Sequence, residues 1–184
     1  GLAARGHTLQ SWCPSSADSG YLPLSELVPE HVVPFEWQDV SSTGMLANLM
    51  YPLRSVRSQL LAMDRAAARC ARDIAQGDFD LLLANSCRYF RAPSIGRHVG
   101  SMPKVLYLQE PYRWLYEALP ELPWVRGGPT LAGGESFPRR ARRIVRDGIR
   151  LQGLRLQANE ERTNAASFDR LLVNSLFTRE SVMR

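Results

Sequence analysis

The sequence predicts an α/β fold in which helices flank a Rossmann-like, doubly wound parallel sheet. One apolar segment, Phe79–Ser86, recurs as Phe168–Ser175, and both copies run through apolar residues without alternation. Such a run is typical of a strand covered on both faces. Each copy ends at an Asn-Ser pair, which favours a turn or a helix start. A third segment, Lys104–Pro111, has the same plan, and three buried strands with long helical spacers indicate a parallel sheet.

The spacing of apolar residues, prolines and glycines predicts the order of the elements. Pro34 restricts one strand to a sheet edge, Gly77 ends a long helix, and Pro138 suits the first turn of another. In the first half of the chain we expect a strand at 8–14, an edge strand at 31–37, a capping sequence Ser41-Ser42-Thr43, a helix from about 53 to 76 and a strand from 79. A short helix at 93–99, a strand at 104–108 and a helical turn at 112–118 follow. The chain then continues with a Pro- and Gly-rich loop at 119–137, a helix at 138–166, a strand at 169–173 and a helix from 176.

The two ends of the chain predict a single domain that is truncated at both sides. Residues 1–7 are typical of the end of a helix, a glycine cap and the turn into a strand. A helix in this position follows a strand in a doubly wound sheet, so we expect that the first strand is absent from this chain. The last predicted helix still continues at Arg184, and the length of 184 residues suits one domain.

Composition narrows the partners and the compartment without identifying them. The net charge is +5 and comes almost wholly from arginine, because Lys104 is the only lysine. A basic balance suits phosphates, nucleotides, acidic lipid surfaces or nucleic acid. No apolar run approaches the ~20 residues that span a bilayer, and no secretory signal begins the chain. Three widely spaced cysteines, Cys13, Cys70 and Cys87, fit neither a disulfide framework nor a metal site, which predicts a cytoplasmic protein.

The densest polar cluster follows the third strand, and we expect a binding site there. Ligands of open parallel sheets bind just beyond the carboxyl ends of the strands. Arg113 could hold a phosphate or carboxylate with two hydrogen bonds, and Glu110 could accept hydrogen bonds from hydroxyl groups. The alternative is that these two side chains pair with each other or cap a helix. The cluster comprises Gln109, Glu110, Pro111, Tyr112 and Arg113.

The two Asn-Ser pairs are further candidates at the same edge of the sheet. Asn174 and Ser175 precede a predicted helix, whose N-terminus could receive an anion or a sugar hydroxyl. On its own, the pattern favours the simpler alternative that Ser175 only caps this helix. Asn85 and Ser86 carry the same but weaker signal.

Four arginines form a possible anion-binding surface on the predicted helix 138–166. Arg139, Arg143, Arg146 and Arg150 fall on one helix face, opposite Ile144, Val145 and Gly148. This face could bind anionic lipid or a polyanion. The lack of interleaved aromatic residues favours a solvated face instead, and argues against single-stranded nucleic acid.

The sequence lacks the motifs of metal sites and of several classes of enzyme. His7, His31 and His98 have no cysteine or histidine at ligand spacing, so we expect no metal site. There is no P-loop, no Gly-x-Gly-x-x-Gly and no Gly-x-Ser-x-Gly, which disfavours a nucleotide hydrolase, a typical dinucleotide dehydrogenase and a typical serine esterase.

Three segments together resemble the amino-terminal domain of family 4 glycosyltransferases, which have the GT-B fold. Residues 2–8 are similar to the end of the first helix and the start of the second strand. Residues 107–116 resemble the His-Glu-Pro-x-Arg-x-Leu-Tyr segment of a subset of the family, with Gln109 in place of the histidine. Residues 169–178 resemble the last strand of the domain. The matches occur in family order and span nearly the whole chain.

The resemblance implies the acceptor-side half of a retaining transferase that moves a sugar from a nucleotide sugar to a glycan or lipid-linked acceptor. Glu110 and Arg113 would orient substrate groups, and Asn174 and Ser175 would line the cleft. The donor domain with its paired glutamates and the glycine-rich turn after the first strand are not in this chain, so we expect no turnover by residues 1–184 alone. We expect no cofactor or metal, and a cytoplasmic location that includes peripheral membrane contact. The alternative is a non-catalytic module that binds anionic lipid or a polyanion through the arginine face.

Overall fold

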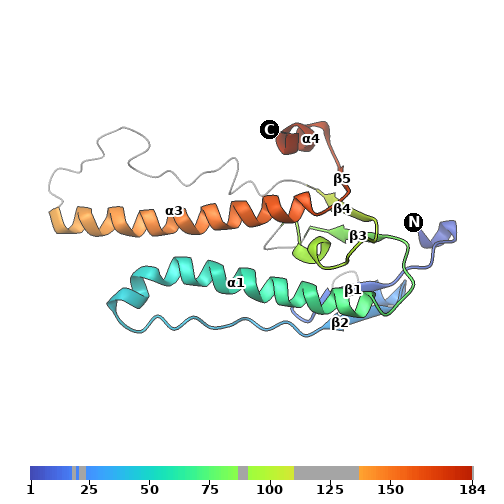
Figure 1. Ribbon diagram of the computed structural model, residues 1–184, viewed down its shortest axis with the longest axis horizontal. Helices are drawn as coiled ribbons and strands as arrows, with labels where there is room; N and C mark the ends of the chain where they lie inside the picture. The colour runs from blue at the N-terminus through green and yellow to red at the C-terminus, as the bar shows by residue number, and fades with distance from the viewer. Residues whose placement is uncertain (18–19, 21–23, 87–90, 110–136, 184) are drawn as a thin grey trace.

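A computed structural model gives the structure of the protein and describes residues 1–17, 20, 24–86, 91–109 and 137–183 (Figure 1). Two predicted features, the helical turn at 112–118 and nearly all of the loop at 119–137, lie outside these residues. The elements are η1 (Ala3–Arg5), β1 (Ser11–Pro14), η2 (Leu24–Glu26), β2 (Glu30–Val33), α1 (Met45–Ile74), β3 (Leu82–Asn85), η3 (Ser94–Arg97), β4 (Lys104–Leu108), α3 (Phe137–Ala166), β5 (Arg170–Val173) and α4 (Leu176–Met183).

The strands are parallel, as the sequence predicts, but in the described residues they form two sheets rather than one. β3, β4 and β5 pair in that order, and β1 pairs with β2 in a separate two-stranded sheet. Phe79, which lies just before β3, contacts Trp12 of β1 edge-on, with 5.4 Å between the ring centroids. The two sheets therefore lie near each other. The expectation of one continuous sheet is therefore corrected, while the α/β class with parallel strands is confirmed.

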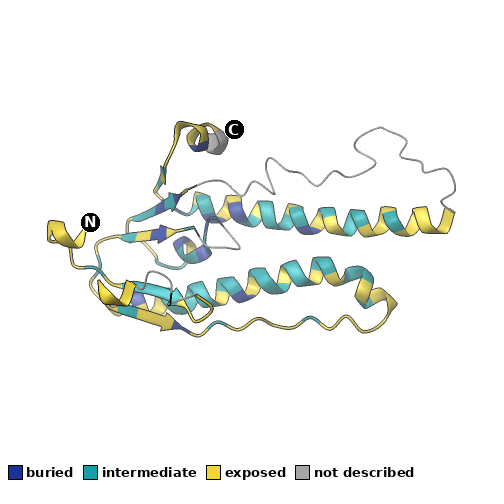
Figure 2. Ribbon diagram, turned by 180° about the vertical axis from the view of Figure 1, so that it is seen from behind, coloured by how far each residue is buried: buried dark blue, intermediate teal, exposed yellow. Residues whose placement is uncertain are grey.

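Among the residues that the structure describes, the three-stranded sheet is covered on one face, whereas the sequence predicts strands that are buried on both. Ala84, Leu106 and Leu108 form a buried core with Ala92 and Phe168. The neighbouring positions point the other way, and Leu81, Leu83 and Leu172 are about half exposed (Figure 2). A strand with apolar side chains on both faces is therefore buried on only one face here, as far as the described residues show.

α1 begins at Met45, eight residues before its predicted start at Leu53. Pro52 lies inside the helix, where a proline removes one hydrogen-bond donor and bends the axis. The predicted cap at 41–43 is wrong, because Gly44 is the residue at the N-cap position and no side chain caps the helix. Ser41 and Thr43 contact each other instead, with 3.1 Å between their hydroxyl oxygens.

The two long helices α1 and α3 lie side by side and begin at the same end of the molecule (Figure 1). Gly153 lies against α1, since a Cβ on this residue would be at ordinary contact distance, 3.5 Å from Val56 Cγ2 and 3.9 Å from the Pro52 carbonyl oxygen. The buried residues of α3 are Gly153, Glu161 and Asn164, of which none is a large apolar residue. Of these three, Gly153 faces α1, whereas Glu161 and Asn164 bind the backbone of residues 91 and 92.

The start of the chain and the predicted helix at 93–99 take tighter forms than expected. η1 is a single 3₁₀ turn that ends at Gly6, whose φ of 87° is left-handed, as the predicted glycine cap requires. η3 is also a 3₁₀ turn, at Ser94–Arg97, and it packs against both long helices. Among the described residues, no helix has the length and apolar character needed to cross a membrane.

Candidate functional site

The carboxyl ends of β3, β4 and β5 lie at one edge of the three-stranded sheet, where the sequence predicts the site. In the parallel register, Asn85 pairs with Tyr107, and Leu108 pairs with Val173. Gln109 and Asn174 therefore follow adjacent strands at the same level. Glu110, Tyr112 and Arg113, the rest of the predicted cluster, lie outside the described residues.

Thr178 of α4 joins three polar groups at this edge, and it was not predicted. Its hydroxyl Oγ1 donates to the Gln109 carbonyl oxygen at 3.2 Å and lies 3.3 Å from Asn174 Oδ1. The same oxygen lies 3.0 Å from Ser175 Oγ. Thr178 is only 2% exposed, so this contact is protected from solvent. The structure thereby brings together Gln109, Asn174 and Ser175, three of the predicted site residues.

Ser175 caps α4, as the simpler alternative predicts. Its hydroxyl Oγ accepts a hydrogen bond from the Thr178 backbone N–H at 3.1 Å, which satisfies one of the free donors at the helix start. The Ser175 residue is nevertheless exposed, as are Asn85, Gln109 and Asn174. These polar side chains are therefore accessible to a ligand at the strand ends.

The other Asn-Ser pair, Asn85 and Ser86, lies at the same edge of the sheet and contacts β4. Ser86 Oγ donates to the Tyr107 carbonyl oxygen at 3.3 Å. Asn85 ends β3 beside Tyr107, so β3, like β5, has an Asn-Ser pair at its carboxyl end. The bond fixes the first residue after β3 to the neighbouring strand.

Glu161 and Asn164 of α3 hold the segment that returns to the core after β3. Glu161 Oε1 and Oε2 accept hydrogen bonds from the backbone N–H groups of Arg91 and Ala92, both at 2.8 Å. Asn164 Nδ2 donates to the Ala92 carbonyl oxygen at 3.0 Å. Burial raises the pKa of Glu161, and the two backbone hydrogen bonds and the positive charge of Arg91 offset this only in part.

An ion-pair network links α1, η3 and α3 behind the sheet. Arg97 Nη2 lies 2.7 Å from Asp64 Oδ1 and 2.6 Å from Glu160 Oε1, and His98 Nε2 donates to Asp64 at 2.8 Å. Burial alone would raise the pKa of Asp64, but hydrogen bonds from His98 and Arg97 outweigh it and lower the pKa. His98, treated in the sequence as an isolated histidine, therefore has a structural partner.

Sequence reasoning missed Thr178, Glu161, Asn164 and Asp64 for one common reason. All four are polar residues whose helix positions face the protein interior, whereas hydrophobic periodicity identifies only apolar residues there. For Thr178, the spacing of three from Ser175 at a helix start was an available signal. For Glu161 and Asn164, their spacing of three on the face that contains Gly153 was the corresponding signal.

The four predicted surface arginines lie on the first half of α3, away from the strand ends. Arg139, Arg146 and Arg150 are exposed, and Arg143 is partly buried. Their spacing of three and four residues continues to Gly153. The arginines and Gly153 therefore share one face of α3, and the part of this face at Gly153 packs against α1. Ile144 and Val145, on the opposite side of the helix, are about half exposed.

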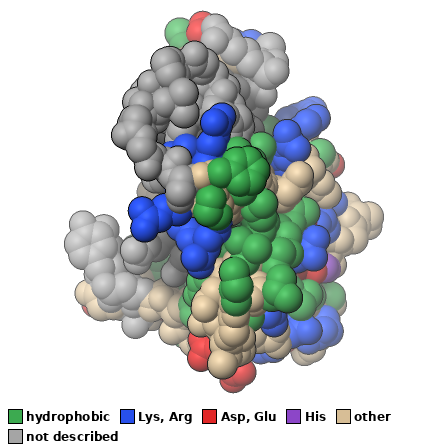
Figure 3. All heavy atoms as spheres, turned by 90° about the vertical axis from the view of Figure 1, so that its left-hand side faces the viewer, with side chains coloured by type: hydrophobic (Ala, Val, Ile, Leu, Met, Phe, Trp, Pro, Cys, Tyr) green, Lys and Arg blue, Asp and Glu red, His purple; other side chains and the backbone are tan. Residues whose placement is uncertain are grey.

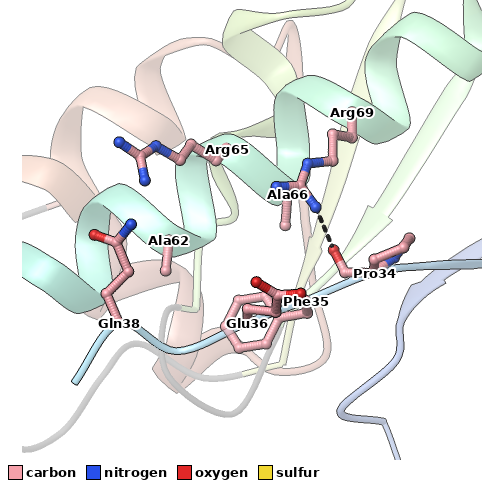
Figure 4. A pocket seen from close by; sticks show the side chains of 8 residues that line it. All are labelled: Pro34, Phe35, Glu36, Gln38, Ala62, Arg65, Ala66 and Arg69. Carbon is pink, nitrogen blue, oxygen red and sulfur yellow. Dashed lines mark hydrogen bonds between the residues drawn. The ribbon is translucent and has the colours of Figure 1, made fainter.

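A small hollow between α1 and residues 34–38 does not compete with the strand ends as a site (Figure 4). Arg69 Nη1 closes part of it by donating to the Pro34 carbonyl oxygen at 3.0 Å. Its volume of about 50 Å³ suits a few waters, far below the roughly 300 Å³ of small-molecule sites. In the part of the chain that the structure describes, no three His, Cys, Asp or Glu residues are grouped so that they could hold a metal ion.

Comparison of the chain with protein-family models, with curated proteins and with solved structures found no match. The class of the molecule is therefore given by its α/β fold. Its candidate site is the polar edge, formed by Asn85, Gln109, Asn174 and Ser175 at the carboxyl ends of β3, β4 and β5.

Proposed function

We propose that residues 1–184 are the acceptor-side half of a retaining glycosyltransferase that moves a sugar from a nucleotide sugar to a glycan or lipid-linked acceptor. The observation that carries the proposal is the meeting of Gln109, Asn174 and Ser175 at the carboxyl ends of adjacent parallel strands. Open α/β sheets bind their ligands at this edge. The resemblance of residues 107–116 and 169–178 to family 4 glycosyltransferases supports the same assignment, since the strands that these segments include, β4 and β5, end at this edge.

Each proposed residue has a role that follows from its chemistry. Amide groups of Gln109 and Asn174 can both donate to and accept from sugar hydroxyls. Glu110 accepts hydroxyl hydrogens and Arg113 holds a phosphate or carboxylate with two parallel bonds. Gln109 has no titratable proton, so it orients groups and does not act as a general acid or base. A separate donor-binding domain supplies most of the charge stabilisation for the departing diphosphate.

A binding experiment on the protein itself tests the location of the site. Octyl β-glucoside and UDP-glucose are titrated separately while backbone amide resonances are followed by NMR. We expect shifts at Gln109, Asn174 and Ser175, and weaker binding by about tenfold or more in Glu110→Ala and Arg113→Ala, because each substitution removes charge-assisted bonds. Arg162→Ala, at an exposed position of α3, is the control. Shifts confined to other parts of the molecule would overturn the assignment.

Transfer itself is tested after residues 1–184 are joined to a donor-binding domain. Glu110→Ala or Arg113→Ala should then lower the rate by about 100-fold, because each substitution removes charge-assisted hydrogen bonds that position a substrate. Wild-type rates in both variants would exclude the proposed function.

The second candidate is a non-catalytic basic module in the cytoplasm, at a membrane surface or on a polyanion. The exposure of Arg139, Arg146 and Arg150 favours it. It predicts binding that falls steeply with salt and is lost when Arg139, Arg143, Arg146 and Arg150 are changed to glutamine. The two candidates are compatible, because a transferase with a lipid-linked acceptor gains from contact with the membrane.

A further inference from the structure

We infer that the hollow between α1 and residues 34–38 binds a single phosphate group, either the free ion or a small monoester, at a site separate from the ends of β3, β4 and β5. The side chains of α1 that line the hollow share one side of the helix, because they follow one another at spacings of three and four residues. They are Ala62, Arg65, Ala66 and Arg69 (Figure 4). The two alanines are short, so space remains between the helix and residues 34–38.

The hollow lies just beyond the carboxyl end of a strand. β2 ends at Val33 and pairs in parallel with β1, and residues 34–38 follow it directly. Ligands of parallel α/β sheets bind beyond the carboxyl ends of the strands. The two-stranded sheet therefore places this hollow where the fold favours a ligand.

The segment opposite α1 is held in place by hydrogen bonds near both of its ends. Arg69 Nη1 donates to the Pro34 carbonyl oxygen at 3.0 Å, and Ser58 Oγ donates to the Gln38 carbonyl oxygen at 2.9 Å. The backbone N–H of Phe35 donates to Ser15 Oγ at 3.0 Å. Both walls of the hollow are thus ordered before a ligand binds, which lowers the entropy cost of binding.

Two positive charges at the hollow lack an anionic partner. In the part of the chain that the structure describes, neither Arg65 nor Arg69 forms an ion pair, although Glu36 lines the same hollow. Like charges four residues apart on a helix repel each other, and an oxyanion between them relieves this repulsion. Guanidinium groups suit phosphate because their planar N–H donors match its oxygens. Arg69 uses one of its donors on Pro34 and keeps the others for a ligand.

The size of the hollow restricts what it can hold. Its volume of about 50 Å³ has room for a few waters. One phosphate group can replace such waters, whereas a nucleotide or a sugar ring cannot fit and would remain in solvent. The ligand is therefore recognised by its phosphate group, and this site does not bind the nucleotide sugar of the proposed transfer reaction.

The arginines at the starts of the two long helices form a different group. Figure 3 views this end of the molecule and shows Lys and Arg side chains beside exposed hydrophobic ones. Arg139 belongs to the start of α3, and Arg72 lies in the last turn of α1. Neither lines the hollow, so both positions serve as charge-matched controls.

An NMR titration of the whole protein at constant ionic strength tests the inference, with inorganic phosphate as the probe. We expect saturable shifts at residues 35–38 and at the side-chain Nε–H groups of Arg65 and Arg69, with a dissociation constant on the order of 1 mM. Arg65→Gln should weaken binding by about fivefold, because it removes charge-assisted hydrogen bonds. Ala66→Leu should abolish binding by filling the hollow without changing its charge. Glu36→Gln should tighten binding by about threefold, because it removes a negative charge.

A parallel titration with glycerol 3-phosphate distinguishes the two sources of the phosphate group. Tighter binding than that of inorganic phosphate identifies a monoester as the ligand, and weaker binding identifies the free ion. The controls Arg72→Gln and Arg139→Gln should bind phosphate as the wild type does.

Three results would overturn the inference. The first is a loss of affinity in Arg72→Gln or Arg139→Gln as large as that in Arg65→Gln, because phosphate would then respond only to the net charge. The second is wild-type binding by Ala66→Leu, and the third is shifts that do not saturate. Thermal unfolding without phosphate checks that each variant is folded. If Ala66→Leu is not, Arg65→Gln at its exposed position decides the question.

Discussion

The hydroxyl of Thr178 donates to the carbonyl oxygen of Gln109 at 3.2 Å and thereby ties the start of α4 to the end of β4. The donor is buried, whereas the side chains of Gln109 and Asn174 beside it are exposed. Exposed amide side chains on an ordered backbone suit ligand binding. The entropy cost of ordering the backbone is then met during folding and not during binding.

Ser175 gives a prediction that separates capping from ligand binding. Ser175→Ala should lower the free energy of unfolding by about 1 kcal/mol, since it removes the acceptor for the Thr178 N–H. Ser175→Asp should restore this stability because aspartate also caps helices. If Ser175 also contacts a ligand, octyl β-glucoside binding will differ between wild type and Ser175→Asp at equal stability. Urea unfolding and NMR titration measure the two quantities, and Ser175→Ala as stable as wild type would contradict the cap.

Glu161 should be among the most sensitive positions of the fold. Glu161→Ala leaves two backbone N–H groups, those of Arg91 and Ala92, without their acceptor, which should cost about 2–4 kcal/mol in urea unfolding. Arg162→Ala, next in sequence and exposed, should stay within roughly 0.5 kcal/mol of wild type.

The raised pKa of Glu161 also predicts the pH dependence of this difference. A raised pKa in the folded state makes protonation favour folding. The stability advantage of wild type over Glu161→Ala should therefore grow as the pH falls from 7 through the raised pKa toward the ordinary glutamate value. An advantage that shrinks over this range would contradict the burial of an ionisable carboxyl group at this position.

Asp64 predicts the opposite dependence on pH. Its lowered pKa means that its contribution is present above the ordinary aspartate pKa and is lost as the pH falls through the lowered value. Asp64→Asn should cost about 1 kcal/mol at pH 7, a modest amount because 33% of the side chain is exposed. Thermal unfolding at several pH values should show this cost beginning to shrink below about pH 4 and vanishing below the lowered pKa. A constant difference down to acidic pH would argue against the ion pair with Arg97.

Gly153 and Gly148 of α3 form a matched pair of helix glycines. A Cβ on Gly148 would have no neighbour within 4 Å, and a Cβ on Gly153 would lie at ordinary contact distance from Val56. Alanine at either position should stabilise the protein by roughly 0.5–1 kcal/mol, because alanine loses less backbone entropy. Leucine should be tolerated at 148 but should destabilise at 153, where it would force α1 and α3 apart. Thermal unfolding distinguishes these outcomes, and a tolerated Gly153→Leu would contradict the close packing.

Cys70 should be a slow nucleophile in the folded protein. Burial first, and then the charge of Asp73, raise its pKa to about 11. At pH 8 the thiolate fraction is then on the order of 0.001, and the thiolate is the reactive form. Alkylation by iodoacetamide should accelerate at least 100-fold in urea, as followed by mass spectrometry of the peptide that contains Cys70. Equal rates with and without urea would show that the thiol is not buried.

The sequence predicted the elements better than their assembly. Apolar runs ending at Asn-Ser located β3 and β5, because short strands with turn residues leave a local signal. The start of α1 was missed because the spacing of apolar residues indicated the helix only from about Leu53, whereas the helix begins at Met45 and contains Pro52. The division into two sheets left no local signal, since pairing between distant strands depends on tertiary contacts.

The candidate site was predictable only where it depends on topology. Strand ends of a parallel sheet converge by geometry, so Gln109 and Asn174 were expected to meet. Thr178, which fixes this edge, and Glu161, which holds the segment after β3, are buried polar residues. Their partners are backbone atoms about 70 positions away, namely those of Gln109 and Ala92. Such pairs follow from the folded structure alone.

The register of β4 with β5 sets the order in which the molecule can fold. Val105 pairs with Arg170, and all of α3 lies between them in the chain. Helices of this length form within microseconds, whereas closing so long a stretch of chain carries an entropic cost before any strand contact forms. We therefore expect refolding to be slower than helix formation, and the polar edge to form only once β5 has paired with β4.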